Sequence, residues 1–304
     1  LEKYDEWKDD PDMIGDVMRF LDNVLSDFIN KAPDQFRDAK YSAERERSVG
    51  LGVMGFHSFL QKKRIPFDSV MAKVWNKRIF SKIKEEADKA STVLAFEKGA
   101  CPDAKDYGVN ERFSNKIAIA PTASISIICG GASPGIEPIA ANSFTQKTLS
   151  GSFNVRNPHL KSLLVEKGKD NEETWSSITI NKGSVQHLEF LDDSEKAVFK
   201  TAFELDQRRV VELAGDRTPY VCQAQSLNIF LKPDVSKRDL HMIHFSAWKR
   251  GVKSLYYLRS LSIQRAEVVS HNKKTTEVPI KGKINEGEEP YGNQLDYDEC
   301  LSCQ

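Results

Sequence analysis

The sequence contains no long apolar stretch and no excess of either charge. A membrane-spanning helix needs about 18 or more uninterrupted apolar residues, and the most apolar window, 117–132, is broken by Pro121 and two glycines. Lysine and arginine together number 44, and aspartate and glutamate also number 44. Because the chain is neutral, nothing in its composition favours a nucleic acid or a membrane as partner. We expect one large globular domain or two of ordinary size.

A secretion signal is also missing from the start of the sequence. The first five residues, LEKYD, contain three charged side chains and no apolar run, which does not fit a signal peptide. We therefore expect a cytoplasmic protein. The first residue is not methionine, so we also expect a processed product or the later part of a longer protein.

Cysteine is scarce, and its positions do not suggest a disulfide framework. The five cysteines are Cys101, Cys129, Cys222, Cys300 and Cys303. An odd number at irregular spacing is a poor basis for structural disulfides in a chain of this length. We expect the first three to be small buried hydrophobes. The last two differ, because they form a C-x-x-C pattern close to the end of the sequence.

Several segments have apolar residues at helical spacing. Helices are predicted at 12–29, 44–61, 68–97, 158–168, 170–178, 194–214 and 236–250. Asp10 and Pro11 are expected at the start of the first, and Ser194 and Gly215 at the two ends of the sixth. Three glycines lie within 44–61, where each costs up to about 1 kcal/mol relative to alanine. We expect close backbone packing against a neighbour to compensate.

Other segments have the pattern of strands. Extended structure is predicted at 116–120, 143–156, 223–231 and 254–259. Strands that alternate with helices indicate an α/β fold with a parallel sheet, and 144–231 reads as an insertion of strand, helices and strand. Beyond about Ile263 apolar residues become rare. This tail is predicted to be disordered, because it cannot bury enough surface to offset its ordering entropy.

The segment from Ala120 to Ser126 is a candidate anion site, because a predicted strand ends there in a turn of small residues. Backbone amides at such a turn are available, and a helix that begins there favours an anion, so a phosphate fits. Thr122, Ser124 and Ser126 supply further hydroxyl donors. The segment is neither a G-x-x-x-x-G-K-[ST] nor a G-x-G-x-x-G motif. An ordinary strand-to-helix turn is the alternative interpretation.

Two adjacent tyrosines, Tyr256 and Tyr257, form a second candidate. On a regular strand adjacent side chains face opposite sides of the sheet, so one core ring and one covering ring is the plain interpretation. A functional pair requires a local distortion near the strand end that brings the rings together. Phenols are oxidisable, so such a pair can relay an electron and a proton.

The C-x-x-C pattern of Cys300 and Cys303 is a third candidate. In a cytoplasmic chain it is half of a zinc site or a thiol–disulfide couple. Zinc needs two further ligands, and no second C-x-x-C is present; His241 and His244 are expected on a helix surface. A flexible tether of about 40 residues reaches about 35 Å, so the pair can visit a buried site and return. This favours the redox alternative.

Five motifs in chain order resemble the large subunit of class I ribonucleotide reductase. They are 43–56 (AERERSVGLGVMGF), 120–126 (APTASIS), 133–138 (SPGIEP), 255–259 (LYYLR) and the C-terminal cysteine pair. Each is weak alone, but the set in this order is specific and extends over nearly the whole chain. The tyrosine pair favours class I over the cobalamin-dependent class.

The resemblance implies a fold. The family has a ten-stranded α/β barrel made of two parallel half-barrels, and this chain matches the C-terminal half. Residues 1–143 are then the first part of the half-barrel, 144–222 a small inserted α+β subdomain, and 223–263 the last strands and helix. Residues 264–304 are then a flexible redox tail.

The resemblance also implies an activity, the reduction of ribonucleoside diphosphates to deoxyribonucleoside diphosphates. The substrate diphosphate is then bound by Pro121, Thr122, Ala123, Ser124 and Ile125. Tyr256 and Tyr257 pass an oxidising equivalent from a radical-generating small subunit toward an active-site cysteine. Cys300 and Cys303 reduce the disulfide formed at each turnover, and thioredoxin or glutaredoxin then reduces them.

The same resemblance implies where the cofactor and partners belong. No cofactor or metal is expected on this chain, and the metal or radical cofactor is expected on the small subunit. The helix at 236–250 is expected to border the groove that receives the small subunit's C-terminus.

One departure from the family pattern is large. The radical cysteine of the family lies in an Asn-x-Cys-x-Glu loop, and no cysteine here has those neighbours. We expect the chain to be inactive without an N-terminal half, as a truncated sequence or the product of a split gene. The alternative from another class is a non-catalytic phosphate-binding scaffold with a zinc-holding tail.

Overall fold

The structure is a computed structural model that describes residues 1–148 and 151–260. Its helices are α1 Tyr4–Trp7, α2 Met13–Lys31, α3 Arg37–Glu46, α4 Phe56–Lys62, α5 Val70–Lys98, α6 Pro102–Asp106, α7 Ala123–Ile128, α8 Pro158–Glu166, α9 Glu172–Ile180, α10 Asp193–Val198, α11 Gln207–Arg217 and α12 Lys237–Lys249. Its strands are β1 Ser143–Thr148, β2 Gly151–Arg156, β3 Ile229–Leu231 and β4 Leu258–Ser260. The predicted disordered tail, with Cys300 and Cys303, lies outside the described residues.

Parallel extended segments form the centre of the fold. They are joined in sequence order through the bridges Leu51 to Ile117 and Ile119 to Gln225 and through the parallel pairing of β3 with β4. Helix α5 connects the first segment to the second, and α12 connects the third to the fourth. Parallel neighbours require such crossovers, so the predicted α/β class with a parallel sheet is confirmed.

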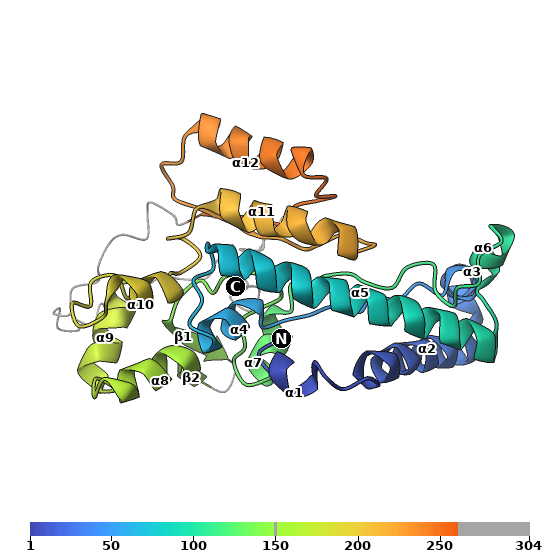
Figure 1. Cartoon of the computed structure of the whole chain (residues 1–304), viewed down its shortest axis with the longest axis horizontal. Coiled ribbons are helices and arrows are strands. Elements are labelled where there is room, and N and C mark those ends of the chain that lie inside the picture. Colours follow the sequence, from blue (N-terminus) through green and yellow to red (C-terminus); the bar gives the residue numbers. More distant parts are fainter. Residues whose placement is uncertain (149–150, 261–304) are drawn as a thin grey trace, which may run out of the picture.

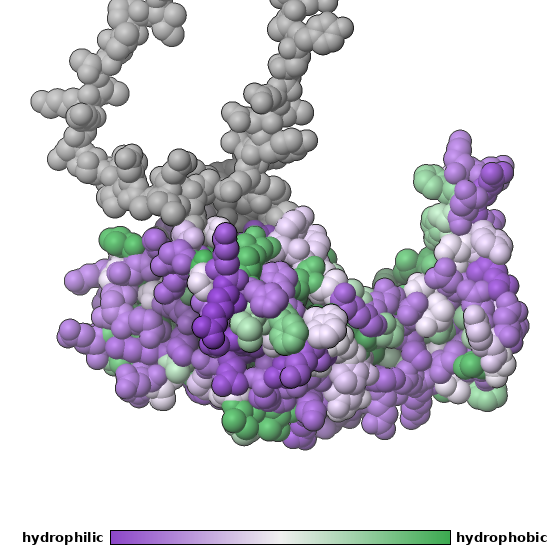
Figure 2. Space-filling view, turned by 90° about the horizontal axis from the view of Figure 1, so that it is seen from above, coloured by the Kyte–Doolittle hydropathy of each residue, from purple (hydrophilic) through white to green (hydrophobic). Residues whose placement is uncertain are grey.

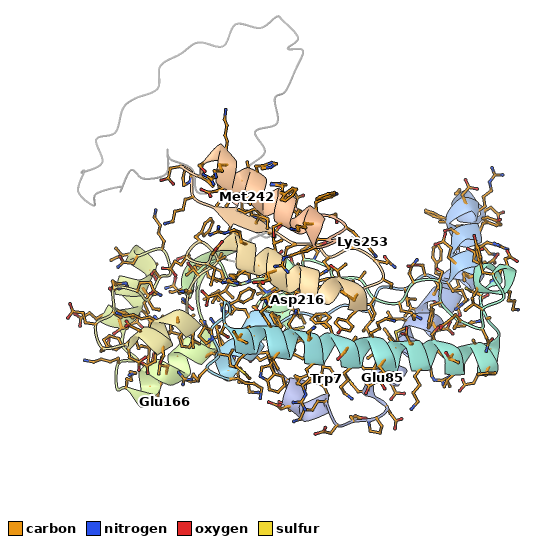
Figure 3. All side chains as sticks on the ribbon, turned by 45° about the horizontal axis from the view of Figure 1, so that its top comes forward. Trp7, Glu85, Glu166, Asp216, Met242 and Lys253 are labelled. Carbon is orange, nitrogen blue, oxygen red and sulfur yellow. The ribbon has the colours of Figure 1, made fainter. Side chains whose placement is uncertain are left out.

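Helices pack around these segments in layers. In Figure 3, α12 with Met242, α11 with Asp216 and α5 with Glu85 lie one above another. Helix α2 packs along the C-terminal half of α5, as Figure 1 shows. Figure 1 shows α2, α3 and α6 at one end of the molecule and α8 to α10 at the other. The main core includes Met18, Phe56, Ile79, Ile119 and Val211, all almost fully buried. Within the described residues no helix is long and apolar enough to cross a membrane.

The region between β1 and α10 has a hydrophobic core of its own. Strands β1 and β2 form an antiparallel hairpin, and α8, α9 and α10 bring together Leu160, Trp175, Ile178 and Phe199. The extended pattern at 143–156 is confirmed as this hairpin. The boundaries 144–222 that we gave to the inserted subdomain stay a prediction.

The single helix expected over 44–61 is wrong. Helix α3 ends at Glu46, Arg47 adopts a left-handed conformation with φ of 44°, and 49–53 runs as an extended segment beside 116–120. Helix α4 then begins after Gly55. The close packing expected of the glycines is present, but against a strand: a Cβ on Gly52 would lie 2.6 Å from the Ala118 carbonyl oxygen. Only glycine permits that approach.

The helix expected over 194–214 is two helices, α10 and α11. The cap of α10 is Asp192 rather than Ser194, because the Asp192 carboxylate accepts from the Glu195 amide and the Glu195 carboxylate accepts from the Asp192 amide. Gly215 does not end α11, which continues to Arg217. Of the three cysteines expected in the core, Cys101 is buried, but Cys129 and Cys222 are exposed, so that prediction is wrong for two of them.

Candidate active site

The turn at 121–126 follows the 116–120 segment directly, as predicted. Thr122 has φ of 54°, an uncommon conformation for a β-branched residue, and α7 begins at the next residue. The first bond inside this helix runs from the Ser126 amide to the Thr122 carbonyl at 2.9 Å. The amides of Ala123, Ser124 and Ile125 precede that bond and have no partner within the helix.

The hydroxyls of this turn differ in what they face. The Thr122 hydroxyl oxygen accepts from the Gly135 amide at 2.7 Å, which ties the turn to the loop at 133–138. Ser126 is buried and donates to the Ala123 carbonyl, so it does not serve as an outward donor as expected. Ser124 is exposed. Thr122 keeps a hydroxyl proton that it can donate.

The loop at 133–138 is held by the start of α4. Ser133 and Ser58 exchange hydrogen bonds, each amide donating to the other's hydroxyl, at 2.8 and 3.1 Å. The Gly55 amide donates to the Ser133 carbonyl at 2.7 Å. The Ile139 amide donates to Nδ1 of His57 at 3.0 Å. These bonds fix the loop on the α4 side of the turn.

Glu137 links this loop to the third parallel segment. Its side chain is only 3% exposed, and Oε1 accepts from the Asn228 amide at 2.7 Å while Oε2 accepts from Asn228 Nδ2 at 3.0 Å. Burial raises the pKa of Glu137, and the hydrogen bonds from Asn228 and the charge of Arg259 partly oppose that rise.

The rings of Tyr256 and Tyr257 are in contact. Their centroids lie 4.2 Å apart with an interplanar angle of 62°, and the residues are 50% and 51% exposed. They precede β4, whose first residue is Leu258, so the regular alternation of a strand does not apply to them. The plain expectation of one core ring and one covering ring is wrong. The Arg259 guanidinium lies over the Tyr257 ring, 5.7 Å from its centroid.

The backbone around the pair is tied to the third segment. The Tyr256 amide donates to the Leu227 carbonyl and the Ile229 amide donates to the Tyr257 carbonyl, both at 2.9 Å. The Tyr257 amide donates to Asn228 Oδ1 at 3.2 Å.

The parallel register places the turn and the tyrosines at one level. The pairing of Ile119 with Gln225 sets 121–122 level with 227–228, and the pairing of β3 with β4 sets 227–228 level with 256–257. Neighbouring strands lie about 4.8 Å apart, so the turn and the tyrosine backbone, with one segment between them, are expected about 10 Å apart. The turn lies at the carboxyl end of the 116–120 segment, where open α/β sheets bind ligands, and the tyrosines, just before β4, are level with that end.

Sequence reasoning quoted Glu137 in a motif without giving it a role, and it missed Asn228. A glutamate between an isoleucine and a proline, in Ile136-Glu137-Pro138, was the signal for a buried carboxylate. Nothing local marks Asn228 as its partner. Two cavities of about 310 and 330 Å³ lie elsewhere, against β2 and α9 and between the end of α4 and α10, and neither is lined by the turn or the tyrosines.

Comparison with known proteins gives the family. A family model described as "Ribonucleotide reductase, barrel domain" matches residues 2–110 and 103–258. The ribonucleoside-diphosphate reductase large subunit of Invertebrate iridescent virus 6 is 49% identical over 276 residues, which are 90% of this chain and 29% of that protein. The large subunit of Danio rerio is 33% identical over 80% of this chain and 34% of that protein. The chain thus spans well under half the length of these two relatives.

A solved structure agrees with the sequence relatives. The Actinobacillus ureae class Id ribonucleotide reductase alpha subunit matches with a TM-score of 0.79 and 42% identity, over 86% of this chain and 48% of that one. The helix-rich α/β arrangement described above is a partial barrel of this kind. The chain therefore belongs to the ribonucleotide reductase large-subunit family.

Proposed function

We propose that this chain is the C-terminal part of a ribonucleotide reductase large subunit that reduces ribonucleoside diphosphates to 2′-deoxyribonucleoside diphosphates for DNA synthesis. Family membership supports the reaction class. The observation that carries the proposal is the common level of the turn at 121–126 and the tyrosine pair, joined by hydrogen bonds through the loop at 133–138. A substrate held at the turn then lies close to the route by which a radical arrives.

The turn is the proposed site for the substrate diphosphate. The amides of Ala123, Ser124 and Ile125 have no hydrogen-bond acceptor within α7, because they belong to its first turn. The side chain of Ser124, which is exposed, adds a hydroxyl beside them. Pro121 and the left-handed Thr122 set the direction in which α7 begins. A phosphate at this position accepts from backbone amides and hydroxyls and requires no lysine.

The tyrosine pair is the proposed relay. Contact between the Tyr256 and Tyr257 rings at 4.2 Å suits the passage of an electron between the two phenols, each of which gives up and regains a proton. The oxidising equivalent arrives from a small subunit that holds the metal or radical cofactor. It leaves for a cysteine in the N-terminal half, because the Asn-x-Cys-x-Glu sequence is not in this chain. The chain alone is therefore proposed to be inactive.

Cys300 and Cys303 are the proposed source of reducing equivalents. Each turnover forms a disulfide in the active site, and the two thiols reduce it by exchange, becoming a disulfide themselves. A thioredoxin or glutaredoxin then supplies two electrons and two protons to restore them. Their position near the C-terminal end of the sequence suits a shuttle.

The tyrosine pair provides the test. In a large subunit that contains this chain, assembled with its small subunit, Tyr256→Phe and Tyr257→Phe should each lower nucleotide reduction at least about 10³-fold, since phenylalanine has no hydroxyl proton to give up when the ring is oxidised. Diphosphate binding, measured by calorimetry, should stay within about twofold, because the turn is untouched. Tyr220→Phe, outside the pair, is the control. Full turnover by either pair variant would refute the relay.

A further inference from the structure

Glu137 is a buried carboxylate that the proposed chemistry does not use. Its two carboxylate oxygens accept from two donors of Asn228, the backbone N–H at 2.7 Å and the side-chain Nδ2 at 3.0 Å. Burying a carboxylate is costly unless it makes good hydrogen bonds, and burial accordingly raises the pKa of this group. A costly group at the edge of a candidate active site points to a role beyond stability.

The position of Asn228 explains why an acceptor is needed there. The last backbone bond between the 116–120 segment and the third segment runs from the Ser226 amide to the Ile119 carbonyl at 2.9 Å, and the 116–120 segment ends before Pro121. Beyond that point the amides on this side of the third segment lack a neighbouring strand. Glu137 takes the place of the missing strand for Asn228, as Gln207 does for Phe230 at 2.9 Å.

Asn228 transmits this contact to the tyrosines. The side-chain amide of Asn228 lies between two partners: Nδ2 donates to Glu137 Oε2, and Oδ1 accepts from the Tyr257 backbone amide at 3.2 Å. Because the ionised carboxylate of Glu137 only accepts hydrogen bonds, it fixes which end of the Asn228 side-chain amide faces Tyr257. A wrongly turned Asn228 would set an NH₂ group against the Tyr257 N–H.

We propose that Glu137 is a positioning residue for the tyrosine pair, acting through Asn228 on the backbone of Tyr257. The inference rests on the proposed function, since the placement of the rings matters for catalysis only if they relay a radical. A displacement of about 1 Å in a reacting group can cost about 10²-fold in rate. The loop at 133–138 thus holds the substrate turn through Gly135 and the relay through Glu137.

An exchange of carboxylate and amide tests the hydrogen-bond chain. Glu137→Gln leaves one oxygen for the two donors of Asn228, so its NH₂ group faces either Asn228 Nδ2 or the Asn228 backbone N–H, and turning Asn228 only moves the first mismatch to Tyr257. Asn228→Asp sets two carboxylates face to face. The double variant restores every pair, because the amide introduced at position 137 donates to the carboxylate introduced at position 228. The second oxygen of that carboxylate accepts from the Tyr257 amide.

The first measurement uses this chain itself. Amide hydrogen exchange at Tyr257 should become at least about tenfold faster in each single variant, as expected when the partly buried hydrogen bond that protects this amide is lost. In the double variant it should return to within about threefold of the unmodified chain. Exchange within α5 is the internal control. Unchanged protection in both single variants, or no recovery in the double variant, overturns the proposal. If a single variant does not fold, the double variant alone decides by the same criterion.

The second measurement separates this inference from the proposed function. In a complete large subunit with its small subunit, both single variants should lower kcat at least about tenfold with KM for the diphosphate unchanged, and the double variant should recover. If Tyr257→Phe retains turnover, the proposed function fails. If Tyr257→Phe abolishes turnover but Glu137→Gln does not reduce it, only the role of Glu137 is overturned.

Discussion

Among single residues, His57 shows how burial fixes a proton. It is fully buried in α4, its ring lies edge-on to Phe67 with centroids 5.2 Å apart, and Nδ1 accepts from the Ile139 amide. The proton of the neutral ring is therefore on Nε2. Burial lowers the pKa of His57 from 6.5 to about 3, so the folded protein keeps it neutral where the unfolded chain protonates it.

Because the pKa of His57 is lowered in the folded protein, the free energy of unfolding should fall as the pH drops below 6.5. Between pH 6.5 and 3 the unfolded state binds one proton more than the folded state, so His57 costs up to about 1.4 kcal/mol of unfolding free energy per pH unit as pH falls. His57→Asn keeps an acceptor for Ile139 but cannot titrate. At pH 7 it should be less stable by about 1–3 kcal/mol because a buried ring is lost.

Urea denaturation at pH 7, 6 and 5 checks this, and the difference between the unmodified chain and His57→Asn should shrink as the pH falls. His244→Asn, on the exposed side of α12, is the matched control and should leave the unfolding free energy nearly unchanged. A constant difference for His57→Asn across this range would mean that the folded protein protonates His57.

The residues that sequence identified at the site are those with unusual local chemistry. Three small or hydroxyl side chains after a strand marked the turn, and adjacent phenols marked the pair. Contact between the two tyrosine rings was expected only if the backbone departed from a regular strand, and the sequence does not show where such a departure occurs. The bond from Asn228 to Glu137 was not predictable, because it joins residues 91 apart in sequence. The burial predicted for Cys129 and Cys222 was wrong, because a small side chain such as cysteine fits both buried and exposed positions.

At the scale of elements, Gly52 decides how closely two parallel segments approach. An added Cβ would lie 2.6 Å from the Ala118 carbonyl oxygen, whereas one on Gly50 would lie 3.3 Å from the Ala118 Cβ. Gly52→Ala should therefore lower the free energy of unfolding by about 1–3 kcal/mol, because backbone must move. Gly50→Ala should cost less than about 1 kcal/mol. Urea unfolding curves compare the two.

Gly15→Ala is the control for the intrinsic effect of removing a glycine. Gly15 lies in α2 with nothing within 4 Å of an added Cβ, so alanine should stabilise by up to about 1 kcal/mol. Equal effects of alanine at positions 50 and 52 would show that the close approach to Ala118 does not limit the packing.

Helix α5 and the segment 44–61 show which elements the sequence can predict and which it cannot. Helix α5 was predicted closely, because a long amphipathic pattern and the Gly99 stop act locally. The apolar residues of 44–61 also fit a helix, but they belong to a helix end, a buried extended segment and a new helix. Short buried segments have no period of their own, and pairing with 116–120 is a tertiary choice that the local pattern does not contain.

At the scale of the whole molecule, α12 packs on one side only against the residues that the structure describes. Ile243 and Ala247 are buried toward α11, whereas Met242, Phe245 and Trp248 remain exposed on the other side, Trp248 to 73%. Met242 is labelled on this helix in Figure 3. Seen from above in Figure 2, apolar patches lie among mostly hydrophilic side chains. Exposed aromatic residues grouped on one helix mark binding surfaces, so this side of α12 is where we expect the C-terminus of the small subunit to bind.

Charges on the exposed side of α12 should weaken binding of the small subunit without unfolding the protein. Phe245→Asp and Trp248→Asp place a charge where an apolar contact is expected, and each should weaken binding of a peptide with the small subunit's C-terminal sequence at least about tenfold. Because both side chains point away from Ile243 and Ala247, the thermal unfolding midpoint should change little. Ile180→Asp, 80% exposed in α9, is the matched control. Calorimetric titration measures the affinities, and unaltered binding by both α12 variants would place the small subunit elsewhere on the molecule.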